Sequence, residues 1–88
     1  MPSYLVETYL ARCRTAAGSG CEQRARAAAA ELTRAGTRIR FGGVIHVPED
    51  ETCFFVFDAP SSAAAALVAE RAALDPLRVV EAVTSGEE

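Results

Sequence analysis

Two apolar segments on either side of a short acidic turn constrain this chain most. Residues 38–47 read RIRFGGVIHV, residues 52–59 read TCFFVFDA, and PEDE joins them. β-Branched and aromatic residues in runs of this length, bounded by a turn, are typical of two antiparallel strands. The sequence therefore predicts a hairpin whose turn is centred on Glu49 and Asp50.

A turn at that position makes both faces of the hairpin apolar. One face is expected to carry the opposed pairs His46 and Cys53, Val44 and Phe55, and Gly42 and Phe57. The other face is then expected to carry Phe41, Gly43, Ile45, Val47, Thr52, Phe54, Val56 and Asp58. An open antiparallel sheet normally alternates between an apolar side and a polar, wet side. We therefore expect both faces of this hairpin to be buried against other segments or against a partner.

The rest of the chain completes a β-α-β-β-α-β order. Strand patterns occupy residues 3–9 and 77–83, and helix patterns occupy residues 19–36 and 61–74. This order predicts an α+β, ferredoxin-like fold: a four-stranded antiparallel sheet with two helices on one face and the first and third strands in the centre. We expect one domain over residues 1–84 and a frayed tail over residues 85–88.

The expected helices have recognisable ends. Ser19 with Glu22 forms a capping-box pattern at the first helix, and Gly36 is placed to end it. Ser61 is the expected cap of the second helix, and an Asp-Pro step at residues 75–76 breaks it. The first helix also carries a stripe of mostly small residues at helical spacing, Cys21, Ala25, Ala28, Ala29 and Leu32. Such a stripe permits close packing against a sheet whose own side chains are large.

Two helices cover only one face of a sheet, so the second face predicts a partner. Symmetric self-association is the commonest solution, and it predicts a homodimer, either a dimeric α/β barrel or a sheet-to-sheet sandwich. A pocket for a small molecule between the sheets would be lined by Tyr4, Tyr9, Val44, Phe55 and Phe57. The alternative is that residues 10–18 or the tail fold over this face.

Composition excludes several classes of protein. No apolar run approaches the roughly 20 residues of a membrane-spanning helix, and the first residues lack the pattern of a secretory signal. The net charge is −3, and all nine basic residues are arginines without a basic block, which argues against nucleic-acid binding. Three cysteines cannot all pair within one chain, which favours reduced thiols and a cytoplasmic location.

A family resemblance runs along nearly the whole chain. It rests on MPSYLVETYL, RARAAAAELTRAG, IRF, the acidic turn followed by TCFFVFDAP, the alanine-rich second helix and the closing VVEAV. Together these resemble a small family of domains of unknown function typified by a nickel-binding protein. The resemblance implies a ferredoxin-like domain that dimerises, with nickel or another divalent transition metal, or a small molecule, as the candidate ligand.

The chain departs from that family at polar positions. Phe55 stands where family members carry a cysteine in the third strand, and Val68 stands where they carry a histidine in the second helix. Val44 and Ile45 stand where members carry a Ser-Tyr pair. These differences remove candidate metal ligands and leave the expected fold and dimer unchanged.

Candidate chemistry centres on three residues. His46 and Cys53, opposed on one face, could hold a soft metal ion, but two ligands are too few for tetrahedral zinc or planar nickel. The alternative is a polar rim residue beside a buried thiol. Glu7 lies on the first strand, with Tyr9 on the same face and Tyr4 on the opposite face. Its carboxylate could act as a general base. Alternatively it forms a structural ion pair with Arg38, Arg40 or Arg78.

The sequence leaves two main functions open. The first is a homodimeric module that binds a small apolar molecule, or a metal ion, between its sheets. The second is a small cofactor-free enzyme of the dimeric α/β-barrel kind, of cyclase or monooxygenase type, with Glu7 or His46 as acid and base. A pure assembly domain with a filled interior is a third.

Overall fold

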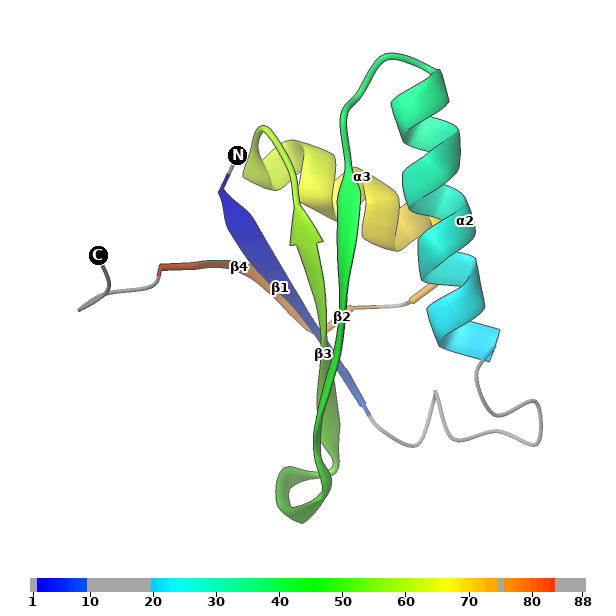
Figure 1. Ribbon diagram of the computed structural model, residues 1–88. Helices are drawn as coiled ribbons and strands as arrows, with labels where there is room; N and C mark the ends of the chain where they lie inside the picture. Colours follow the sequence, from blue (N-terminus) through cyan, green and yellow to red (C-terminus); the bar gives the residue numbers. More distant parts are fainter. Residues whose placement is uncertain (1, 10–19, 75, 84–88) are drawn as a thin grey trace.

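The expected order of elements is confirmed in the computed structural model, which describes residues 2–9, 20–74 and 76–83 (Figure 1). The elements are β1 (Ser3–Tyr9), α2 (Gly20–Arg34), β2 (Arg40–Val47), the 3₁₀ turn η1 (Pro48–Asp50), β3 (Thr52–Asp58), α3 (Ser62–Arg71) and β4 (Arg78–Ala82). The expected cap Ser19, the covering segment 10–18, Asp75 of the Asp-Pro step and the tail 85–88 lie outside the described residues.

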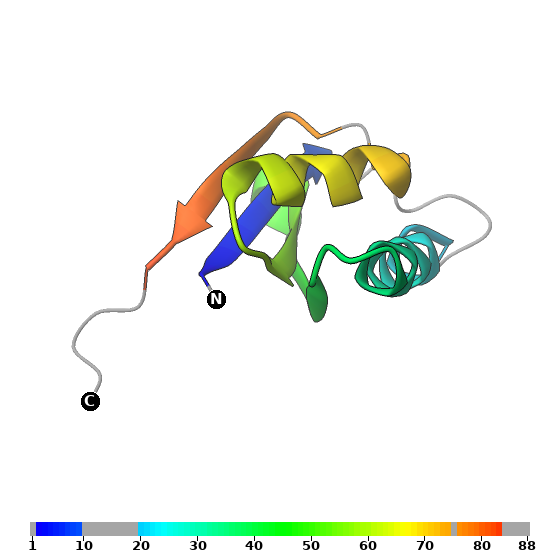
Figure 2. The same ribbon diagram turned by 90° about the horizontal axis from the view of Figure 1, so that it is seen from above.

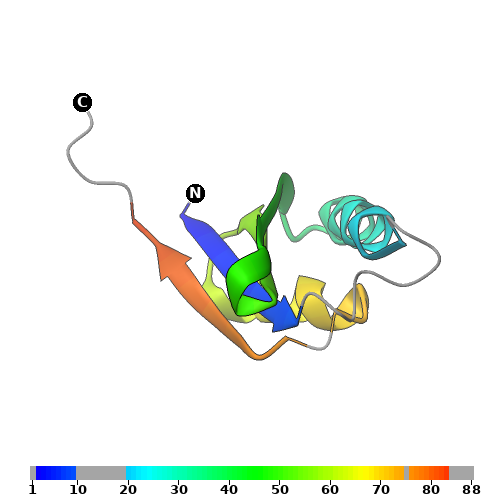
Figure 3. The same cartoon turned by 90° about the horizontal axis from the view of Figure 1, so that it is seen from below.

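The four strands form one antiparallel sheet in the order β2-β3-β1-β4. The first and third strands are therefore central, as the ferredoxin-like order predicts. Both helices lie on the same side of this sheet, as the views from above and below show (Figures 2 and 3). The chain thus has a two-layer α+β architecture in which one sheet face is covered by helices and the other is not.

The core lies between the helices and the covered sheet face. Its strand residues are Tyr4, Val6, Cys53, Phe55 and Phe57, and its helix residues are Cys21, Ala25, Ala28, Ala29, Leu32, Ala64, Ala65, Val68 and Ala69. The helices contribute mostly small side chains, while the strands contribute the aromatic rings. Small residues let the helices approach the sheet closely, so the expected stripe on the first helix does pack inward.

A bulge in β2 changes the predicted register at one end of the hairpin. His46 opposes Cys53 and Val44 opposes Phe55 as expected, but Phe41 rather than Gly42 opposes Phe57. Gly43 accommodates the irregularity with φ of +128°, a value that side chains disfavour. The predictions for Phe41 and Gly42 were therefore wrong, because the extra residue in the bulge turns Phe41 to the helix side.

Because of the bulge, the Phe41 side chain lies on the helix side and packs against the edge of the core. Its ring centroid lies 5.4 Å from that of Phe57 and 6.3 Å from that of Phe55. The guanidinium of Arg26 lies 5.1 Å above the Phe41 ring, and Arg26 also pairs with Glu22 at 3.1 Å. These contacts fasten α2 over the edge strand β2 through a cation–π interaction.

The helix ends follow local rules. Ser61 caps α3, since its hydroxyl accepts a hydrogen bond from the Ala64 amide at 3.2 Å. The helix ends at Arg71, earlier than the pattern over residues 61–74 predicts, because Ala73 takes a left-handed conformation. α2 ends at Arg34, shortly before Gly36, whose φ is +111°. No helix in the described ranges has the length and hydropathy needed to cross a membrane.

Candidate functional site

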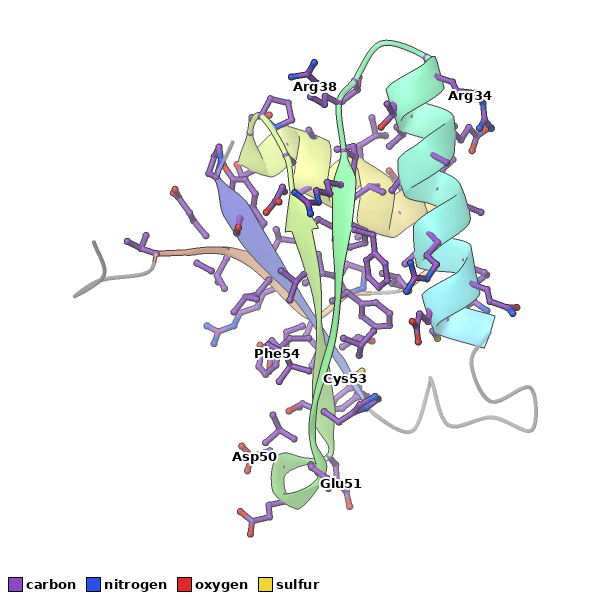
Figure 4. The ribbon with its side chains drawn as sticks, viewed as in Figure 1. Arg34, Arg38, Asp50, Glu51, Cys53 and Phe54 are labelled. Atoms are coloured by element: carbon purple, nitrogen blue, oxygen red, sulfur yellow. The ribbon has the colours of Figure 1, made fainter. Side chains whose placement is uncertain are left out.

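The sheet face turned away from both helices is the candidate site, and we call it the open face. It carries Leu5, Glu7 and Tyr9 of β1, Ile45 and Val47 of β2, Phe54 and Val56 of β3, and Arg78 and Val80 of β4. Ile45 and Tyr9 are about half exposed, at 49% and 48%. Figure 4 shows neighbouring Phe54 and Cys53 pointing to opposite sides of β3, with Cys53 toward the helices.

The strand register arranges the open face into an apolar band with polar neighbours. Gly43, Val56, Leu5 and Val80 lie side by side across the four strands. The next row along the strands is Ile45, Phe54, Glu7 and Arg78. On the other side of the band, Ser3 donates a hydrogen bond from its hydroxyl to Oδ1 of Asp58 at 2.6 Å. An apolar centre with a polar rim is the usual composition of a protein–protein interface.

Glu7 lies within the open face, next to the apolar band. Its Oε1 accepts a hydrogen bond from Nε of Arg78 at 2.7 Å, across the β1–β4 ladder. The Glu7 side chain is only 18% exposed, whereas that of Arg78 is 68% exposed. Of the three arginines that the sequence offers as partners, Arg78 is thus the one that pairs. An opposite charge at this distance stabilises a carboxylate that is largely shielded from water.

The residues expected to line a ligand pocket are divided between the two faces. Tyr4, Phe55 and Phe57 are buried in the core beneath the helices, and Val44 is partly buried beside them. Only Tyr9 lies on the open face. The first four therefore line the interior of one chain, because the helices cover the sheet face that carries Phe55 and Phe57.

The sequence did contain a signal for which face stays open. On β1 the buried positions are Tyr4, Val6 and Thr8, while Glu7 alternates with them. Asp58 and Arg78 share the face of Glu7. The face with these charged residues is the one left to solvent, since burying charge under helices is costly. Leu5, Phe54 and Val56 then follow as its apolar residues.

His46 and Cys53 are opposed as predicted, but the pair does not fit a metal centre. His46 is exposed and Cys53 is fully buried, and both belong to the helix side of the sheet. Across the described parts of the chain no three or more His, Cys, Asp or Glu side chains gather as a set that could hold a metal ion. His46 also lies on the opposite face from Glu7, so the two candidate acid–base groups do not meet.

A surface hollow of about 510 Å³ lies on the helix side. It is lined by Ala66, Glu70 and Ala73 of the α3 region and by Pro76. None of these residues belongs to the open face. The hollow and the open face are therefore separate features.

The comparisons with known proteins add no function to this geometry. Neither protein-family models, nor curated proteins, nor solved structures gave a match.

Proposed function

We propose that the protein is a homodimeric module that holds a small, largely apolar molecule between the open faces of two sheets. The observation that carries this proposal is the apolar band of Val56, Leu5 and Val80 on a sheet face that neither helix covers. Removing apolar area from water is worth about 25 cal/mol per Å². A second copy offers a face of the same size and composition.

The composition of the open face supports a symmetric partner. Its apolar residues lie next to polar groups that are already satisfied within the chain, the Glu7–Arg78 ion pair and the Ser3–Asp58 hydrogen bond. Polar groups with their own partners are cheaper to desolvate than unpaired ones. Two such faces can therefore approach one another without separating either of these pairs.

The bulge in β2 supports a space between the two faces. Gly43 stands at the β2 end of the apolar band and has no side chain, and nothing lies within 4 Å of where its Cβ would be. A small apolar molecule bound there would contact Val56, Phe54 and Ile45. These side chains offer shape and apolar surface, which is the common composition of small-molecule sites.

Paired substitutions test the dimer. Ile45→Glu places a charge on the open face at a residue that is 49% exposed, so the chain should still fold. Leu67→Glu, at a residue of α3 that is 38% exposed, is the matched control on the helix side. Light scattering after gel filtration should find dimers for wild type and Leu67→Glu, and monomers for Ile45→Glu. A monomeric wild type would refute the dimer.

The bound molecule needs its own measurement. Native mass spectrometry of the purified dimer would detect a co-purified ligand, and the fluorescence of anilinonaphthalene sulfonate would report an apolar pocket. Both signals should be lost in Ile45→Glu and kept in Leu67→Glu. A wild-type dimer that carries no co-purified ligand and does not bind the dye would instead indicate an assembly domain with a filled interior.

A second candidate is a small cofactor-free enzyme, and the position of Glu7 favours it. Its carboxylate lies on the open face, where it would line a cavity between two sheets and could take a proton from a bound substrate. Glu7→Gln keeps the shape of the side chain, so it should abolish turnover of a substrate found by screening and leave the dimer intact. Unchanged turnover would exclude Glu7 as the base.

The family resemblance also implies nickel or another divalent metal, but nothing in the described residues favours it. Cys53 is buried on the helix side, away from the proposed contact between sheets. Metal analysis in the same native mass measurement would test this directly. One metal ion per two chains would reopen the His46–Cys53 site.

A further inference from the structure

Charged side chains separate to opposite ends of the β2–β3 hairpin. Glu49, Asp50 and Glu51 form an acidic tip at its turn, and Arg34, Arg38 and Arg40 form a basic end where α2 leads into β2. All six are exposed. Figure 4 shows Arg34 and Arg38 at one end of the molecule and Asp50 and Glu51 at the other.

Among the residues that the structure describes, no ion pair neutralises the acidic tip or the basic end. The ion pairs of the described residues join Arg26 to Glu22, Arg71 to Glu31 and Arg78 to Glu7, and so involve neither the acidic tip nor the basic end. Asp58 opposes Arg40 across the β2–β3 ladder and offsets part of the basic end. The described part of the chain therefore has a positive end and a negative end.

The two ends are too far apart to stabilise each other. β2 has eight residues from Arg40 to Val47, which at about 3.3 Å per residue span roughly 26 Å. The Debye length at physiological ionic strength is about 8 Å. The acidic tip and the basic end of one chain therefore do not pair with each other, and a second copy carries an opposite charge for each of them.

We propose that the two sheets of the dimer pack with their hairpins antiparallel, so that the acidic tip of each chain lies against the basic end of its partner. This inference rests on the dimer proposed above and assigns its orientation. A two-fold axis that lies between the sheets and runs perpendicular to the strands makes two equivalent contacts, each between the acidic tip of one chain and the basic end of the other. An axis along the strands would place acidic tip against acidic tip, which like-charge repulsion opposes.

The two parts of the interface then have different roles. The apolar band of Leu5, Val56 and Val80 supplies the area removed from water, and that contribution does not depend on direction. The acidic tip and the basic end select one orientation and speed association at low salt. Dimerisation should therefore weaken as ionic strength rises.

Charge reversal tests this arrangement. Glu49→Arg with Asp50→Arg makes both ends of the chain positive, and Arg38→Glu with Arg40→Glu makes both ends negative. Each double variant alone should dimerise at least about tenfold more weakly at low salt, because unlike contacts become like contacts. An equimolar mixture of the two should recover the wild-type Kd as a heterodimer, in which both end-to-end contacts are again between opposite charges.

A matched control separates this effect from a change in net charge. Glu70→Arg with Glu81→Arg changes the net charge as much as the tip reversal does, but at exposed residues on the helix side. Its dimer should keep the wild-type Kd. Circular dichroism of every variant confirms that the fold is retained.

The outcomes distinguish the orientation from the dimer itself. If the reversed variants keep the wild-type Kd, or if their mixture forms no heterodimer, the antiparallel arrangement is refuted and the dimer proposal stands. If wild type is monomeric, the dimer proposal fails. Sedimentation equilibrium of wild type across a salt series decides the question even where a variant does not fold, since a Kd independent of salt overturns the antiparallel arrangement.

Discussion

Nε of Arg78 lies 2.7 Å from Oε1 of Glu7 and joins the edge strand β4 to the central strand β1 on the open face. A backbone hydrogen bond also joins the two segments, from the Leu77 amide to the Glu7 carbonyl at 2.7 Å. Glu7 is therefore fixed in position next to the apolar band. This position matters equally for a dimer interface and for a catalytic base.

We expect the Glu7–Arg78 ion pair to contribute little to the stability of a single chain. Arg78 is 68% exposed, and exposed pairs are worth about 0.2–1 kcal/mol. A double-mutant cycle of Glu7→Gln and Arg78→Gln, followed by urea unfolding at concentrations that favour the monomer, should give a coupling energy in that range. It should shrink in high salt. A coupling energy well above this range would contradict the exposure of Arg78 to water.

Phe55 and Phe54 are neighbours in sequence that should respond very differently to substitution. Phe55 is 1% exposed beneath the helices, whereas Phe54 belongs to the open face. Phe55→Ala should cost about 3–5 kcal/mol of unfolding free energy through lost burial and a cavity. In the monomer, Phe54→Ala should cost clearly less, and its main effect should be a weaker dimer. Equal losses in urea unfolding would contradict the assignment of the two faces.

Thr8 connects the end of β1 to the segment that follows α3. Its hydroxyl is fully buried and donates to the Leu74 carbonyl at 3.0 Å. Thr8→Val keeps the shape but leaves that carbonyl without this donor, at a cost of about 1–3 kcal/mol. Thr8→Ser keeps the hydroxyl and is the control for the lost bond. Thermal or urea unfolding should rank Thr8→Val as less stable than Thr8→Ser.

Ser61 and Ser62 provide a matched pair at the start of α3. Ser61 caps the helix by accepting from the Ala64 amide, whereas Ser62 is the first residue of the helix. Ser61→Ala should lower the unfolding free energy by about 0.5–2 kcal/mol. Ser62→Ala should change it by a few tenths or less, since alanine is the better helix former. A larger loss of unfolding free energy for Ser62→Ala than for Ser61→Ala would show that Ser62, not Ser61, is the N-cap.

Local features of this chain were predictable because their causes lie within a few residues. The Ser61 cap depends on one hydroxyl and an amide three residues later. The pairing of His46 with Cys53 follows from the turn and the strand period of two. The order of helices and strands then left the ferredoxin-like sheet as the simplest arrangement, with β1 and β3 in its centre.

The hydrophobic pattern did not assign the two faces, although the charges of Glu7, Asp58 and Arg78 mark the open one. Both were apolar in sequence, so hydrophobic pattern alone could not show that α2 and α3 would cover Phe55 and Phe57 and leave Phe54 and Val56 open. The bulge at Gly43 was equally hidden, because two glycines permit an irregular register without requiring it. The Phe41 ring lies on the helix side, where it packs against Phe57 and beneath the guanidinium of Arg26. Neither contact is visible in the local sequence.

Local sequence thus set the elements, the Ser61 cap of α3 and the turn of the hairpin, since each depends on neighbours along the chain. The covered face, the open face and the partner of Glu7 depend on contacts between segments far apart in sequence. Glu7 and Arg78 are brought together only when β4 pairs with β1. The candidate site is a product of that packing, because it consists of what the helices leave uncovered.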